Sequence, residues 1–181
     1  MTVSSELRQQ LLDLIPSLRA FAMSLAGDSE RGDDLVQETL VKAWSNFKSF
    51  QEGTNLRAWL FTILRNEFYS QMRKKGREVE DVDGAYAERL STHAPQFGQV
   101  ELEELRRLLG RIPADQREAL LLVGASGFSY EEAADICGCA IGTIKSRVNR
   151  ARARLAELLE LESEAEFGPD QVNEAAVSAA R

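Results

Sequence analysis

The sequence predicts an all-α protein with two small helical domains joined by a flexible linker, and three observations support this. Apolar residues recur at helical spacing over residues 6–75 and again over residues 101–161. Between them, residues 76–100 lose this spacing and contain acids, glycines and a proline. A chain of 181 residues also suffices for two small cores. Residues 162–181 are expected to form an acidic tail.

The first predicted helix begins near Glu6 and ends at Gly27 and Asp28. Pro16 lies inside it and predicts a kink or a break, because proline has no backbone N–H to donate. The apolar side of this helix comprises Leu7, Leu11, Leu14, Ile15, Leu18, Phe21, Ala22 and Leu25.

The second predicted helix, residues 32–47, has an apolar side and an acidic side. Its inward residues are expected to be Leu35, Val36, Leu40, Ala43, Trp44 and Phe47. Its outer side presents Asp33, Asp34, Gln37, Glu38 and Lys42. A face of this kind is usually just solvated, but it also offers carboxylates and a glutamine to a basic partner.

A loop at residues 48–55 leads to a long helix predicted over residues 56–77. Its buried side repeats every four residues as Leu56, Leu60, Leu64, Phe68 and Met72. Another side carries Asn66, Tyr69, Ser70 and Arg73, bordered by Arg65 and Lys74. This mixture suits single-stranded DNA, because cations bind phosphates, a ring stacks on bases and an amide reads a base edge. The alternative is that Tyr69 and Trp59 only complete the core, and for Trp59 that interpretation is preferred.

The C-terminal domain contains a predicted helix-turn-helix at residues 129–155, preceded by a helix that begins at Pro113 and buries Leu120, Leu121 and Val123. Ser129 and Glu132 form a capping-box pattern, and Gly138 ends the first helix of the motif. The second helix buries a stripe of Ile144, Val148, Ala151 and Leu155. Between residues 141 and 155 it carries five basic residues and no acid, which favours entry into a DNA major groove over a merely solvated basic surface.

The distribution of charge explains how a chain of net charge -7 can bind DNA. Residues 65–77 hold five basic residues against Glu67, whereas residues 156–181 hold seven acids. No membrane-spanning run and no signal peptide are expected, which favours the cytoplasm. Cys137 and Cys139 are predicted to be free thiols. No nucleophile–base pair, phosphate loop or metal cluster supports an enzyme, and no cofactor is expected.

Several strings resemble the sigma-70 family of RNA polymerase sigma factors, and in particular its small extracytoplasmic-function branch. IGTIKSRVNRAR, RIPADQREALLL and GFSYEEAADI resemble region 4, and DDLVQETLVKAW resembles region 2.2. The stretch from Phe50 to Asn66 resembles regions 2.3 and 2.4. The two regions occur in the family's order with a linker between them. Regions 1.1 and 3 have no counterpart, which points to the two-domain branch.

By this resemblance the chain is expected to bind core RNA polymerase and to direct transcription initiation at promoters. Polymerase is expected to dock on Asp33, Asp34, Gln37 and Glu38. The −10 element is expected to contact Arg65, Asn66, Tyr69, Ser70, Arg73 and Lys74, with a flipped base held by the loop before this helix. The −35 element is expected to contact Thr143, Lys145, Ser146, Arg147, Asn149 and Arg150, with Arg152 and Arg154 on phosphate.

The string RKKGREVEDVDG further resembles the EcfG-type general-stress sigma factors of alphaproteobacteria. In that group the anti-sigma protein NepR sequesters the sigma factor and the response regulator PhyR releases it, so a NepR-like partner is expected. Two alternatives are a sigma-like mimic that captures an anti-sigma factor, as in PhyR, and a plain helix-turn-helix regulator. The mimic also needs a receiver domain, for which this chain has no room, and the plain regulator leaves the N-terminal domain unexplained.

The flexible linker carries one further expectation about regulation. Two small domains on such a tether should not hold a fixed spacing by themselves. An inhibitor could then clamp both domains together by lying in a groove between them.

Overall fold

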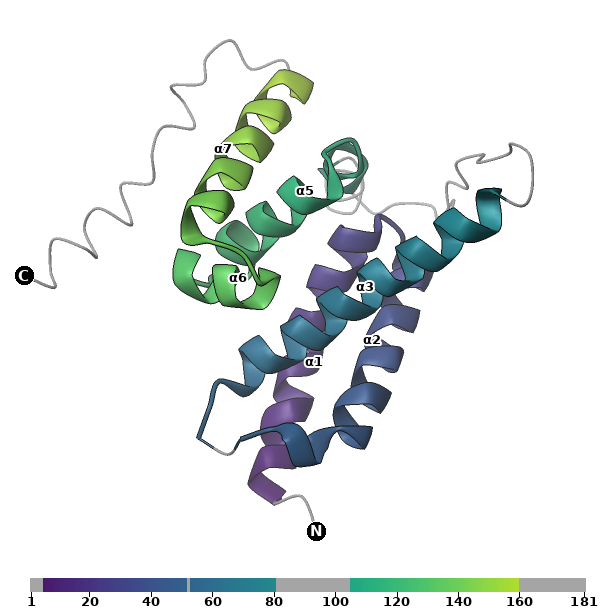
Figure 1. Ribbon diagram of the computed structural model, residues 1–181, viewed down its shortest axis with the longest axis vertical. Helices are drawn as coiled ribbons and strands as arrows, with labels where there is room; N and C mark the ends of the chain where they lie inside the picture. The colour runs from purple at the N-terminus through teal and green to yellow at the C-terminus, as the bar shows by residue number, and fades with distance from the viewer. Residues whose placement is uncertain (1–4, 52, 81–104, 160–181) are drawn as a thin grey trace, which may run out of the picture.

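A computed structural model describes residues 5–51, 53–80 and 105–159 (Figure 1). Within these ranges the chain forms helices and turns without any strand, which confirms the predicted all-α class. The N-terminal part consists of α1 (Ser5–Ala26), α2 (Ser29–Ser45), a 3₁₀ turn (Phe47–Ser49) and α3 (Leu56–Glu80). The C-terminal part consists of a helical turn at 105–110, α5 (Ala114–Leu120), a π-helical turn (Leu121–Ala125), α6 (Tyr130–Cys137) and α7 (Ile141–Leu158).

Two helices differ in extent from the prediction. α1 passes through Pro16 without a break; Pro16 is exposed, and so is Leu12, whose carbonyl loses its helical partner because proline has no N–H. α3 continues to Glu80, so residues 76–80 of the predicted linker are helical. The rest of that linker, and the tail at 162–181, lie outside the described residues.

The N-terminal helices pack around aromatic and leucine side chains. Leu18, Leu60 and Leu64 are fully buried, and the rings of Phe21 and Phe61 lie 5.0 Å apart between centroids. α2 contributes its buried Leu35, Val36 and Ala43 as predicted, with Leu40 and Phe47 half-buried at the edge.

Trp44 does not join this core, so the prediction that it faces inward is wrong. Its side chain is 52% exposed, and the guanidinium of Arg8 lies 5.9 Å from its ring centroid. The reason is its position one residue after Ala43, about 100° further around the helix. Ala43 already occupies the point where α2 meets the core.

α1 and α2 approach each other closely at Gly32, which is buried. A Cβ atom on this residue would lie 2.6 Å from Cγ of Met23 and 2.8 Å from its Cα. The second of these contacts is with backbone, which cannot move aside as a flexible side chain can. The short helix–helix distance therefore depends on glycine at this position.

Gly32→Ala is expected to destabilise the fold by about 1–3 kcal/mol, because the added methyl group must push α1 and α2 apart. Equilibrium urea unfolding measures this effect. The matched control is Gly142→Ala, at an exposed helical glycine with no atom within 4 Å of the added Cβ. The control should be neutral or stabilising by up to about 1 kcal/mol. Equal losses from both variants would contradict the close-approach argument.

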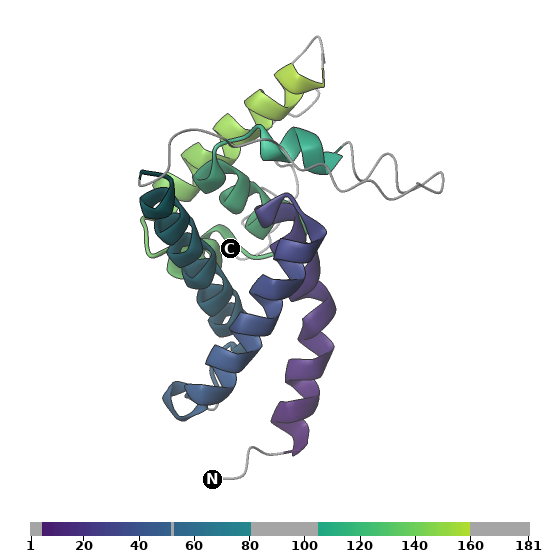
Figure 2. The same cartoon turned by 90° about the vertical axis from the view of Figure 1, so that its right-hand side faces the viewer.

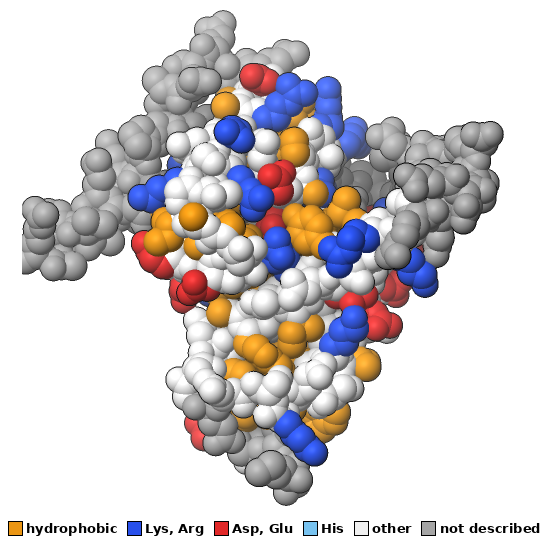
Figure 3. Space-filling view, viewed as in Figure 1, with side chains coloured by type: hydrophobic (Ala, Val, Ile, Leu, Met, Phe, Trp, Pro, Cys, Tyr) orange, Lys and Arg blue, Asp and Glu red, His pale blue; other side chains and the backbone are white. Residues whose placement is uncertain are grey.

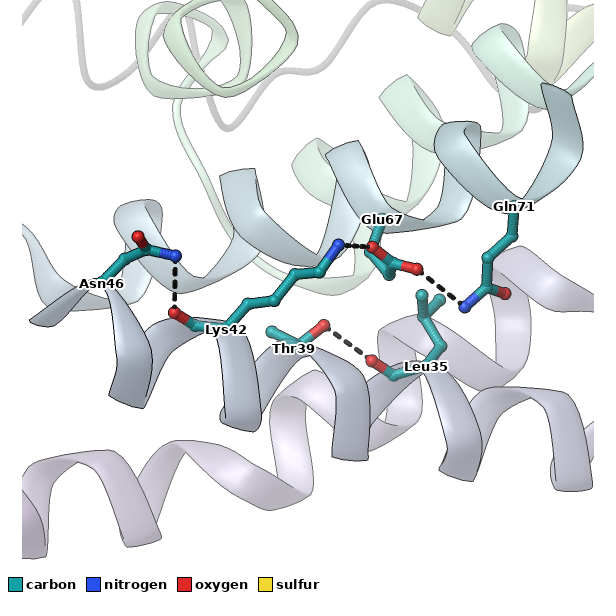
Figure 4. A network of polar contacts seen from close by, with 6 residues as sticks. All are labelled: Leu35, Thr39, Lys42, Asn46, Glu67 and Gln71. Atoms are coloured by element: carbon teal, nitrogen blue, oxygen red, sulfur yellow. Dashed lines mark hydrogen bonds and ion pairs between the residues drawn. The ribbon is translucent and has the colours of Figure 1, made fainter. Parts of the chain in front are cut away.

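α2 and α3 are joined by a polar network around Glu67, which is 8% exposed (Figure 4). The ammonium of Lys42 donates to Oε2 of Glu67, and Nε2 of Gln71 donates to Oε1 at 3.1 Å. Burial alone would raise the pKa of Glu67, but these two hydrogen bonds outweigh it and hold the pKa below its ordinary range. The carboxylate is therefore charged in the native state near neutral pH.

Lys42→Met is expected to cost about 1 kcal/mol of stability at pH 7, because half of the Lys42 side chain remains in water. The folded-state pKa of Glu67 is depressed, so its stabilisation is present above the unfolded pKa and is lost as the pH falls through the folded value. Urea unfolding at pH 7 and pH 3 should therefore show the cost only at the higher pH. Lys48→Met, at an exposed lysine, serves as the control. A cost that does not change with pH would rule out the ion pair as its cause.

The C-terminal helices form the predicted helix-turn-helix. Ser129 accepts from the backbone N–H of Glu132, and the Glu132 side chain accepts from the backbone N–H of Ser129, which completes the capping box. Gly138 ends α6 with a φ of +63°, a left-handed conformation that favours glycine. Ile144 and Val148 of α7 are fully buried, as predicted.

The helix before this motif differs from the prediction in its buried residues. Leu122 is fully buried, whereas Leu120 and Val123 are only half-buried. Val123 lies within the π-helical turn, whose wider turn rotates its side chain away from the position that α-helical spacing predicts. Two charged residues, Arg117 and Glu118, are also buried here, which the helical spacing of apolar residues did not predict.

The two domains pack against each other in this structure, although the sequence predicted only a flexible tether between them. α3 contacts α6, and α1 contacts α5 and the π-helical turn (Figures 1 and 2). At this interface the rings of Phe61 and Phe128 lie 4.9 Å apart, and Arg57 donates to the carbonyl of Ser126. Asn55 donates to Glu132 at 3.0 Å. The physical reason is that α3 presents apolar and polar groups that match the C-terminal domain.

Candidate nucleic-acid interface

α7 brings together the residues predicted to contact the −35 element. Lys145, Asn149 and Arg150 are exposed on its surface, opposite the buried stripe that holds the helix on the domain. Thr143 and Ser146 are half-buried, and the Ser146 hydroxyl donates to the Thr143 carbonyl at 2.9 Å. The exposed cations and amide suit the base edges and phosphates of a major groove.

Two arginines of α7 already have acidic partners within the chain. Nε of Arg147 lies 3.2 Å from Oδ2 of Asp115 on α5. Nη1 of Arg154 lies 2.8 Å from Oε2 of Glu157, one turn later on the same helix. A DNA contact through the paired nitrogen of either arginine therefore requires exchange of the carboxylate for a DNA group.

The residues predicted to contact the −10 element fall into two groups on α3. Asn66, Ser70, Arg73 and Lys74 are exposed, as this interpretation requires. Arg65 and Tyr69 instead turn toward α5 and are half-buried there. On the face shown in Figure 3, basic side chains lie over both the C-terminal helices and α3. Part of the predicted single-strand surface is thus covered by the other domain.

Glu118 is the residue that holds Arg65 and Tyr69. Its side chain is 0% exposed, with Oε1 2.7 Å from Nε of Arg65. The Tyr69 hydroxyl donates to Oε2 at 3.1 Å, and the Arg65 guanidinium lies 4.8 Å from the Tyr69 ring centroid. Sequence reasoning missed both Glu118 and Asp115. The only signal was an acid next to an apolar run, in the string EALLL.

The burial of this cluster shifts its titrations. Burial raises the pKa of Glu118, and the nearby Arg65 only partly opposes this. Burial raises the pKa of Tyr69 as well, and the Glu118 carboxylate adds to the effect. Burial, with Glu118 nearby, raises the pKa of the Cys137 thiol to about 12. Cys137 is therefore a protonated thiol at neutral pH, and both it and Cys139 are free, as predicted.

The predicted polymerase-docking side of α2 is largely open. Asp34, Gln37 and Glu38 are exposed. Asp33 differs, because Arg19 of α1 donates to both of its carboxylate oxygens, at 2.5 and 2.8 Å. These hydrogen bonds lower the pKa of Asp33. The exposed side continues along α2 through Val41 and Trp44, which are 62% and 52% exposed.

The loop before α3 borders a pocket of about 340 Å³, within the size range of small-ligand sites. Its wall combines the start of α1 with the loop and the start of α3: Glu6, Leu7, Gln10, Phe50, Gly53, Thr54 and Leu56. The resemblance to sigma factors implies that this loop holds a flipped base, and the pocket lining includes both apolar and polar residues.

The part of the chain that the structure describes contains neither a candidate membrane-spanning helix nor a candidate metal site. No helix there is long and apolar enough to cross a membrane. The same residues contain no group of three or more His, Cys, Asp or Glu side chains placed to hold a metal ion.

Comparison with known proteins agrees with the resemblance found in the sequence. Residues 12–78 match the family profile of Sigma-70 region 2, and residues 102–155 match that of Sigma-70, region 4. The chain is 58% identical over 177 residues to the ECF RNA polymerase sigma factor EcfG of Rhodopseudomonas palustris, with 98% of each chain covered. It is 38% identical over 131 residues to the ECF RNA polymerase sigma factor SigC of Mycobacterium tuberculosis, with 71% of this chain and 70% of that one covered.

Among solved structures, the sigma factor RpoE of Bartonella quintana, in complex with the anti-sigma factor NepR, has 58% sequence identity and a TM-score of 0.81. That match covers 88% of this chain and 100% of the RpoE chain. The predicted family is therefore confirmed. The chain belongs to the sigma-70 family, in the extracytoplasmic-function branch of RNA polymerase sigma factors that direct transcription initiation.

Proposed function

We propose that this chain is a general-stress sigma factor of the EcfG type, acting in the cytoplasm with core RNA polymerase. The observation that carries the proposal is the 58% identity to EcfG over nearly the full length of both chains. The alignment extends beyond the two family regions and includes the linker, where part of the subgroup resemblance lies.

The division of labour follows the surfaces of the three helices. α7 reads the −35 element through its exposed Lys145, Asn149 and Arg150, together with Arg147 once this arginine leaves Asp115. α3 contacts the −10 element, and the pocket beside its preceding loop holds a flipped base. α2 docks on polymerase through Asp34, Gln37 and Glu38.

The proposed inhibitor is a NepR-like anti-sigma factor. RpoE of Bartonella quintana, at 58% identity, was solved in complex with NepR. A partner that contacts both domains of the present chain would compete with polymerase and would need no covalent change to this chain.

Run-off transcription tests the proposal. The purified chain is added to core RNA polymerase on a template with a promoter used by EcfG of Rhodopseudomonas palustris, with and without a NepR homologue. Transcripts that depend on the chain and disappear on addition of NepR are the expected result. NepR binding without any transcript would instead indicate a sigma-like mimic. DNA binding that polymerase does not affect would indicate a plain helix-turn-helix regulator.

A further inference from the structure

Two acids of the short helix α5 contact residues that are predicted to bind DNA, one acid with residues on α3 and the other with a residue on α7. Glu118 pairs with Arg65 of α3 at 2.7 Å and accepts from the Tyr69 hydroxyl at 3.1 Å. Asp115 pairs with Arg147 of α7 at 3.2 Å. The two acids lie three residues apart, so they share one side of α5. Acids of one helix thus pair at the same time with Arg65, which is predicted to contact the −10 element, and with Arg147, which is predicted to contact the −35 element.

The chemistry of these contacts is that of DNA contacts. Arginine pairs with carboxylates and phosphates through the same charge-assisted geometry, and a tyrosine hydroxyl donates to either anion. Arg65 and Tyr69 are half-buried where they contact Glu118, whose own side chain is fully buried. A phosphate and Glu118 cannot both occupy this position on Arg65.

We propose that α5 is an internal latch, in which Asp115 and Glu118 take the place of DNA phosphates, hold the domains together and withhold Arg65, Tyr69 and Arg147 from promoter DNA. The inference rests on the proposed function, in which α3 contacts the −10 element and α7 the −35 element, and on the predicted DNA contacts of these three residues. Opening the latch frees the −10 surface of α3. It also releases Arg147 on the recognition helix.

The latch is suited to opening. A buried ion pair loses hydration that its mutual attraction repays only in part. The direction of the Glu118 titration agrees, since burial raises its pKa despite the adjacent Arg65. Separation of the domains removes Arg65 and Tyr69 from this carboxylate and leaves it with Cys137 and Arg147 of its own domain. DNA phosphates then pair with the freed arginines, so DNA binding and packing of the two domains compete for the same side chains.

A second set of contacts closes the interface at the N-terminal end of α3. The Arg57 guanidinium lies 4.2 Å from the Phe128 ring centroid and donates to the Ser126 carbonyl. Arg57 is half-buried and belongs to neither predicted DNA surface. Its replacement therefore weakens closure without touching the acids of α5, and it provides an independent way to open the chain.

The test compares Glu118→Gln and Arg57→Ala with wild type as full-length chains. Small-angle scattering gives the radius of gyration. Fluorescence anisotropy at fixed salt gives the affinity for a labelled single-stranded oligonucleotide of mixed sequence. Circular dichroism checks that each variant keeps its helices. Glu131→Gln is the matched control, because it removes the same charge from an exposed residue of α6.

Both variants are expected to increase the radius of gyration by several ångströms and to bind the oligonucleotide about tenfold more tightly. A tenfold gain corresponds to a wild-type chain that is open about one tenth of the time. Arg57→Ala gives the clearer test, because the loss of a cation alone would weaken DNA binding, whereas opening of the domains is expected to strengthen it. Glu131→Gln should change neither quantity.

An unchanged radius of gyration in both folded variants would overturn the latch. Expansion without tighter DNA binding would support the closure contacts but contradict the proposed roles of Arg65 and Tyr69 on the −10 element. The two failures are therefore distinguishable. Arg57→Ala alone decides the question of closure if Glu118→Gln does not fold.

Discussion

Glu38→Lys is expected to weaken binding to core RNA polymerase about tenfold, because a new cation would face a partner surface that is complementary to acids. Glu38 is exposed on α2, on the same side as Asp34 and Gln37. Binding of the chain to core polymerase, followed by anisotropy of a labelled chain, measures the effect. Binding of the same variant to promoter duplex should not change, since α2 lies outside the helix-turn-helix.

Two further variants make this test specific. Glu131→Lys introduces the same charge change on exposed α6 and should leave polymerase binding intact. Asp33→Asn should have a smaller effect than Glu38→Lys, because Arg19 already neutralises the Asp33 carboxylate. If Glu38→Lys bound core polymerase as the wild type does, the acidic side of α2 would not be the docking surface.

The features that could be predicted from sequence are those determined over a few neighbouring residues. The capping box at Ser129, the glycine end of α6 at Gly138 and the buried stripe of α7 all follow from local hydrogen bonding and helical spacing. Their combination gave the helix-turn-helix and its exposed basic residues. The same local rules overestimated Pro16, since a proline on the solvent side of a helix leaves only a carbonyl that water can pair.

The features that could not be predicted depend on residues far apart in the chain. Glu118 meets Arg65 and Tyr69 only after the two domains pack, and no spacing within α5 indicates this. Burial of a charged acid is usually unfavourable, so an acid such as Glu118 beside an apolar run is expected to lie at the surface. Trp44 is the opposite case. Its apolar type predicts burial, but its angular position on α2 places it outside the core.

Arg150→Ala is expected to weaken binding to a −35 duplex by about 1–3 kcal/mol, which corresponds to roughly five- to 150-fold. Arg150 is exposed on α7, and the full gain from a base contact is lost with it. Arg147→Ala should cost less, because wild-type Arg147 must first leave Asp115 and that exchange reduces its net contribution. Anisotropy titrations with a labelled promoter duplex measure both losses.

Sequence dependence separates the arginines that read bases from those that bind phosphates. Arg150→Ala should lose affinity mainly for the promoter and relax the preference at one base-pair position. Arg154→Ala should weaken promoter and random duplexes alike and reduce the slope of log K against log salt by about one. Arg154 can bind phosphate despite its pairing with Glu157, because an exposed ion pair exchanges its carboxylate at little cost. Unchanged −35 binding in both Arg147→Ala and Arg150→Ala would show that α7 does not read this element through its arginines.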